Sequence, residues 1–184
     1  MVFTPNVKVW NRFYGLERVG ASLPFGFAMY GCSLVFPMWA VQKVLLFLVF
    51  FLSGVSAYRL CPGNRVGRFF AGFLYVLNPF VYVRFMAGHL GLLLAYAIMP
   101  FAVKVLMDFF DLRRVEDAVK LAFLATLVSV FSEHMLVLLM FVFAVFLVVK
   151  VASGLRDARL PINVGVFLGS LFVLNVYWLV PSLT

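Results

Sequence analysis

The side chains of this 184-residue chain that could do chemistry lie in short segments between long apolar runs. Arg84 and His89 belong to one such segment, Glu133 and His134 to another, and the chain has no further histidine. A guanidinium binds phosphate oxygens through its fork of donors, and a carboxylate or an imidazole can take a proton from a hydroxyl group. The residue types therefore suit an anion site, with Arg84, His89 and Asn78 as binding residues and Glu133 and His134 as candidate proton acceptors.

Most of these residues also have a structural interpretation. Arg84 at a helix end can reach the lipid headgroups, His89 can bond a loop carbonyl, and His134 can lie at the membrane interface. The macrodipole would stabilise Glu133 in the first turn of a helix by about 0.3–1 kcal/mol. Magnesium and manganese prefer several oxygen ligands, and this group offers one carboxylate. We therefore assign no cofactor, and a divalent metal ion has only weak support.

The composition indicates that the elements holding these residues lie in lipid. Hydrophobic residues make up 65% of the chain, charged residues only 12%, and the mean hydropathy is +1.10. These values exclude a soluble globular domain, a disordered chain and a disulfide scaffold. The apolar runs are continuous rather than alternating, which excludes a transmembrane β-barrel. We therefore expect one all-α domain over residues 1–184, a polytopic transmembrane helix bundle.

The apolar runs predict where the chain crosses the membrane. A helical crossing needs roughly 20 apolar residues, so the length allows about six spans. The segment 21–38 is interrupted by two prolines and two glycines, and either spans the membrane or forms an outer-face hairpin, which we slightly favour. The charged segment 108–118 is expected to be a loop. The expected spans are 40–60, 69–83, 90–107, 119–131, 135–151 and 162–183.

The basic residues predict which ends of the spans face the cytoplasm. If neighbouring spans form hairpins, three connections lie on one side of the membrane and carry Arg59, Arg65, Arg68, Arg113, Arg114, Lys120, Arg156 and Arg159. The opposite side has only Lys43 and Arg84. The positive-inside rule then places the basic connections in the cytoplasm of a multi-pass plasma-membrane protein, and the candidate anion site outside. This topology accounts for the net charge of +8, so we expect membrane lipids rather than nucleic acid as partners.

One stretch, 69–106, carries a recognisable pattern. A tyrosine, an Asn-Pro pair, an arginine, the run GHLGLLLAY and a proline follow one another as Tyr75, Asn78-Pro79, Arg84, residues 88–96 and Pro100. This pattern resembles the GT-C-type polytopic membrane glycosyltransferases, in particular the arabinofuranosyltransferase-like proteins and related uncharacterised membrane proteins. PMWAVQKVLLFLVFFLSGVSAY and NVYWLVPSL, an earlier and a later segment, are similar to helices of the same group. The resemblance covers most of residues 37–183.

The resemblance implies a fold of many transmembrane helices with the active site on the outer face. It also implies a sugar donor linked to polyprenyl phosphate, and an acidic base in the first outer loop. That loop would correspond to residues 10–20, where Glu17 is the only acid, so Glu17 joins the candidate bases. Members of the family are longer, which implies a truncated chain or a partner chain that supplies the missing helices.

Three classes of function stay open at this point. The first is the membrane core of a glycosyltransferase, the second a transporter or channel fragment, and the third a scaffold subunit without chemistry. The Asn-Pro pair and Pro100 could interrupt helices as in transporters, but no span interior carries a charge, which counts against ion coupling. The small-residue pairs Ser53/Ala57 and Gly165/Gly169 are expected to be helix-packing faces.

Overall fold

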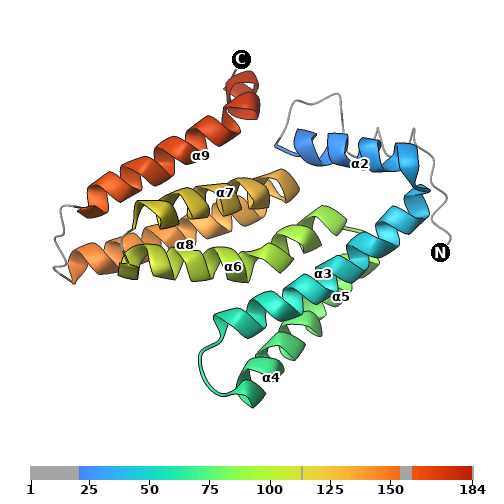
Figure 1. Cartoon of the computed structure of the whole chain (residues 1–184), viewed down its shortest axis with the longest axis horizontal. Coiled ribbons are helices and arrows are strands. Elements are labelled where there is room, and N and C mark those ends of the chain that lie inside the picture. The colour runs from blue at the N-terminus through green and yellow to red at the C-terminus, as the bar shows by residue number, and fades with distance from the viewer. Residues whose placement is uncertain (1–20, 113, 154–158, 184) are drawn as a thin grey trace.

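The computed structural model describes residues 21–112, 114–153 and 159–183, and in these residues it is all-α, as predicted. Candidate Glu17 lies outside the described residues. The helices keep the labels of Figure 1. They are α2 (Leu23–Val35), α3 (Met38–Leu60), α4 (Arg65–Val76), α5 (Pro79–Met86), α6 (Leu90–Leu112), α7 (Val115–Phe131), α8 (Glu133–Ala152) and α9 (Arg159–Leu183).

Long apolar helices make the chain an integral membrane protein. Within the described residues, five stretches are long and apolar enough to cross a bilayer: Met38–Leu60, Arg65–Met86, Leu90–Leu112, Glu133–Ala152 and Arg159–Val180. The second of these consists of α4 and α5 together. The one expected span without a counterpart among these five stretches is 119–131. It belongs to α7, whose 17 residues make it shorter than each of the five.

The segment 108–118, expected to be a loop, is mostly helical. α6 continues to Leu112 and α7 begins at Val115, so this part of the expectation was wrong. Glu116 and Asp117 occupy the first turn of α7, where the macrodipole stabilises acids. Lys120 lies 3.7 Å from Glu116 and 3.5 Å from Asp117, and these pairs support the same turn.

A single short helix, α2, replaces the hairpin favoured for 21–38. Its 13 residues span about 20 Å, too little to cross a hydrocarbon core of about 30 Å. Pro24 sits in the first turn of α2, and Pro37 caps α3, so both prolines mark helix starts rather than breaks. The Phe25 ring meets the Phe131 ring edge-on at 5.2 Å, which places α2 against the end of α7 (Figure 1).

α7 lies at the centre of the bundle, in contact with α6, α8 and α9 (Figure 1). Ala118, Leu121, Ala122, Ala125 and Val128 are fully buried along it. Its alanines allow the neighbouring helices to approach closely, which is how helices pack where lipid removes the hydrophobic driving force. The buried α7 is thus the central helix, and the more exposed helices α8 and α9 pack against it.

The two expected packing faces differ in what covers them. Ser53 and Ala57 of α3 are buried, and beside them the backbone of Gly54 lies against Gly72 of α4. Gly165 and Gly169 of α9 are exposed, and no atom among the described residues lies within 4 Å of where a Cβ would stand at either position. Of the two faces, only the first packs against another part of residues 21–112, 114–153 and 159–183.

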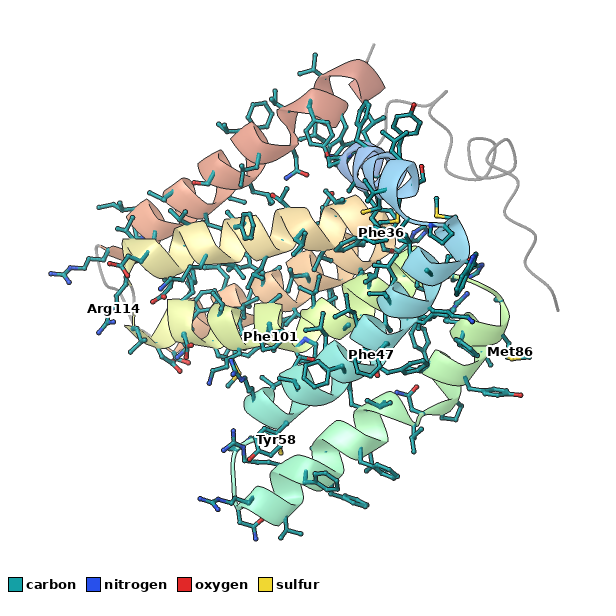
Figure 2. The ribbon with its side chains drawn as sticks, turned by 45° about the vertical axis from the view of Figure 1, so that its right-hand side comes forward. Phe36, Phe47, Tyr58, Met86, Phe101 and Arg114 are labelled. Carbon is teal, nitrogen blue, oxygen red and sulfur yellow. The ribbon has the colours of Figure 1, made fainter. Side chains whose placement is uncertain are left out.

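The hairpin arrangement sorts the charges to two ends of the molecule. We call one the basic end, because it carries Arg59, Arg65, Arg114 and Lys150, and the other the far end, which carries Arg84, His89, Glu133 and His134. At the basic end, Lys150 Nζ lies 2.8 Å from Asp111 Oδ1 and joins α8 to α6. Figure 2 shows Arg114 and Met86, the last residue of α5, on opposite sides of the molecule.

Candidate anion-binding site at the far end

Arg84 and His89 contact each other where α5 gives way to α6. Arg84 Nη1 lies 3.2 Å from His89 Nδ1. A guanidinium can only donate, so Nδ1 accepts, and the ring proton of a neutral imidazole then sits on Nε2. Arg84 is half-buried and His89 is exposed. The pair therefore presents the remaining guanidinium donors and the His89 Nε2–H from one short turn.

The backbone of this turn is a Schellman motif. The His89 N–H donates to Arg84 O at 3.0 Å, the Gly88 N–H donates to Phe85 O at 3.0 Å, and Gly88 has a φ of +73°. An apolar contact usually accompanies this motif, between the two residues that here are Arg84 and His89. Here a polar pair, Arg84 and His89, replaces that apolar contact, and the packing of the turn does not require polar side chains at these positions.

Gly91, the second glycine of the GHLG run, allows the start of α6 to lie directly against the end of α7. A Cβ at Gly91 would lie 2.8 Å from Phe131 O, so only glycine fits there without a shift. This contact sets the start of α6 against the end of α7, one residue before Ser132 and the start of α8. The segment with Glu133 and His134 thus lies at the same end as Arg84 and His89.

Glu133 and His134 are exposed in the first turn of α8. In the part of the chain that the structure describes, no hydrogen bond or ion pair joins either residue to Arg84 or His89. The structure therefore brings Arg84 and His89 together, and places Glu133 and His134 nearby without joining them to the pair.

Asn78, expected as a binding residue, is used by the fold. Its Oδ1 accepts from the Val81 N–H at 3.0 Å and so caps α5. Its Nδ2 donates to Tyr75 O and to the Tyr96 hydroxyl, both at 2.7 Å. Both amide protons are then engaged within the protein, so Asn78 has no donor left for a ligand.

Tyr75 and Tyr96 supply hydrogen-bond donors to the backbone carbonyls that two prolines leave unpaired. A proline leaves the carbonyl four residues earlier without its helical donor, and these carbonyls belong to Tyr75, before Pro79, and Tyr96, before Pro100. The Tyr75 hydroxyl donates to Tyr96 O and the Tyr96 hydroxyl to Tyr75 O, both at 2.9 Å. The rings stack at 4.1 Å between centroids with 7° between their planes. We call this arrangement the tyrosine clasp.

The sequence pattern used above did not predict the clasp, although the spacing between tyrosine and proline carries a signal for it. Tyrosine precedes proline by four residues at Tyr58/Pro62, Tyr75/Pro79, Tyr96/Pro100 and Tyr177/Pro181. At the first of these pairs, Tyr58 O likewise receives a side-chain donor, Arg68 Nε at 3.0 Å. The spacing marks orphaned carbonyls, but which donor reaches each one depends on how the helices pair.

The late NVYWLVPSL segment also serves packing. Asn175 is buried in α9, and its Nδ2 donates to Thr126 Oγ1 of α7 at 2.9 Å. Trp178 Nε1 donates to Asn175 Oδ1 at 2.9 Å, and the Tyr177 hydroxyl donates to Ala21 O at 2.7 Å. These bonds tie α9 to α7 and to Ala21, two residues before the start of α2.

The resemblance pattern thus divides into two groups. Tyr75, Asn78, Gly91, Tyr96 and Pro100 have roles in closing or packing helices, as the contacts above show. Within the part of the chain that the structure describes, the Arg84 and His89 side chains bond only each other, apart from the Phe80 ring, whose centroid lies 5.5 Å from Arg84 Cζ. Among the described residues, no three His, Cys, Asp or Glu side chains are grouped as metal ligands would be.

No protein-family model, curated protein or solved structure matches the chain.

Proposed function

We propose that the far end binds the phosphate of a lipid-linked sugar, and that the chain is the membrane core of a GT-C-type glycosyltransferase. The observation that carries this proposal is the Arg84–His89 pair in the turn between α5 and α6, where the motif ordinarily has an apolar contact. The donor would be a sugar linked to polyprenyl phosphate, as the resemblance of residues 69–106 implies.

The chemistry of the pair suits a phosphate. Arg84 supplies a full positive charge and several donors in a planar fork, and the His89 Nε2–H adds a neutral donor beside it. The exposed side chains of Tyr82, Val83 and Met86 on α5 give an apolar surface next to the pair. A ligand with a charged head and a long hydrocarbon tail matches both features.

The proposed reaction also needs a proton acceptor and a side of the membrane. Glu133 and His134, in the first turn of α8, are candidates to take the proton of the acceptor hydroxyl, as is Glu17 outside the described residues. The positive-inside rule supports a cytoplasmic basic end in the plasma membrane, so the site would face outward. A partner chain would supply the further helices that the resemblance implies.

A transporter is the second candidate, favoured by the break between α4 and α5. In transporters, the carbonyls freed by such a break coordinate ions or substrate. Here the carbonyls of Tyr75 and Tyr96 already accept hydrogen bonds from the two tyrosine hydroxyls of the clasp. The glycosyltransferase proposal is therefore the better supported of the two.

Binding of a polyprenyl monophosphate to the full chain in lipid nanodiscs tests the proposal. We expect Arg84→Ala and His89→Ala each to weaken binding by about tenfold or more, because a charge-assisted hydrogen bond is worth about 1.5–3 kcal/mol. Arg65→Ala, at the basic end, removes the same charge and should leave binding unchanged. Normal insertion with unchanged binding in both far-end variants would reject the anion site and favour a scaffold subunit.

A further inference from the structure

We propose that Tyr75, Tyr96 and Phe80 are positioning residues for Arg84. The three rings follow one another in contact, an arrangement that we call the stack. Its last ring, Phe80, lies under the guanidinium and so sets the Arg84–His89 contact. Their importance for ligand binding rests on the function proposed above, whereas the contact itself can be measured without a ligand.

The stack begins with the tyrosine clasp. Tyr75 is in the last turn of α4, and Tyr96 lies in α6, so the clasp fixes the end of α4 against α6. Asn78 extends the clasp, because its Nδ2 donates to the Tyr96 hydroxyl while its Oδ1 caps α5. The start of α5 is thereby tied to the same point of α6.

The second step leads from Tyr96 to Arg84. The Phe80 ring lies 5.4 Å from the Tyr96 ring, with 35° between the planes, and Arg84 Cζ lies 5.5 Å from the Phe80 centroid. A guanidinium over an aromatic face is attracted by the ring quadrupole, and this attraction restricts where the fork points. Arg84 Nη1 then reaches His89 Nδ1 at 3.2 Å.

The arrangement also explains why the helix is broken here. A single straight helix over residues 65–86 would have no Asn78 cap and no free Tyr75 carbonyl to anchor α5. The break gives α5 its own start, and the clasp fixes that start relative to α6, the helix that begins beside His89. Both partners of the anion pair are therefore positioned from α6.

The imidazole nitrogens of His89 report the contact directly. In a His134→Gln background, His89 is the only histidine, and ¹⁵N spectra of the full chain in nanodiscs show which ring nitrogen carries the proton. We expect the parent to have the proton on Nε2, and Arg84→Ala to give a mixture of tautomers. Tyr75→Phe, Tyr96→Phe and Phe80→Leu should each shift His89 toward the Arg84→Ala spectrum.

Tyr177→Phe is the matched control, because it also removes a tyrosine hydroxyl that donates to a backbone carbonyl, that of Ala21. It should lower stability and leave the His89 spectrum unchanged. If His89 responds to Arg84→Ala but to none of the three stack variants, or responds equally to Tyr177→Phe, the positioning role is wrong.

Binding of farnesyl monophosphate separates this inference from the proposed function. If the parent binds the probe, the three stack variants should bind about threefold or more weakly, with Tyr177→Phe unaffected. If the parent does not bind the probe while the stack variants still move the His89 spectrum, the positioning role stands and the proposed function fails.

Discussion

At the residue scale, the fold requires glycine at some positions and has room for a larger residue at others. Gly91 and Gly72 each lie so close to a neighbouring backbone oxygen that a Cβ would stand 2.8 and 2.7 Å from it. A Cβ at Gly169 would have no atom of the described residues within 4 Å. The sequence alone could not tell these cases apart, because the difference lies in the neighbouring helix.

Gly91→Ala should therefore destabilise the protein, by about 1–3 kcal/mol, because the methyl group forces the start of α6 away from Phe131 O. Gly169→Ala adds the same methyl group in open space, and should be neutral or stabilise by up to about 1 kcal/mol through helix propensity. Reversible unfolding in mixed micelles measures both. Equal effects of the two changes would show that α6 and α7 are not in this close contact.

At the element scale, the sequence predicts most of the helices but not the way in which their ends and breaks are completed. Apolar run length and proline positions gave the spans around 40–60, 90–107 and 135–151. The end of α6 at Leu112 and the start of α7 at Val115 both fall within one charged stretch, and acids at a helix start look like a polar loop in sequence. The tyrosine clasp joins the end of α4 to α6 across a long stretch of chain, and no local pattern encodes that contact.

The clasp predicts a specific rescue. Tyr75→Phe leaves Tyr96 O without its donor and should cost about 1 kcal/mol, in the range measured for hydrogen bonds within membranes. Adding Pro100→Ala restores the N–H that completes this helical bond, so the double variant should regain much of the loss.

The matching control is Pro79→Ala added to Tyr75→Phe. It restores a donor for Tyr75 O, the wrong carbonyl, and so should not rescue. The same unfolding assay compares all variants, and rescue by both proline changes, or by neither, contradicts the reciprocal assignment of donors.

At the scale of the whole molecule, the account depends on the separation of charge between the two ends. Sequence charges and the hairpin assumption predicted this separation, and the arrangement of α6, α7, α8 and α9 in Figure 1 shows the alternating direction that it needs. From this separation, the positive-inside rule predicts the orientation in the membrane. The exposed apolar side chains of α3, α4, α8 and α9 are accounted for by lipid as their solvent.

Labelling of a single cysteine at position 87 tests the central claim most directly. Ala87 is exposed between Arg84 and His89 in ordinary helical conformation, so Ala87→Cys is tolerated once Cys32 and Cys61 are replaced by alanine. We predict that a membrane-impermeant maleimide added outside intact cells labels position 87, and that a polyprenyl monophosphate slows the reaction. Labelling only from the cytoplasmic side, or at a rate that the lipid phosphate does not change, would contradict an outward-facing phosphate site at Arg84 and His89.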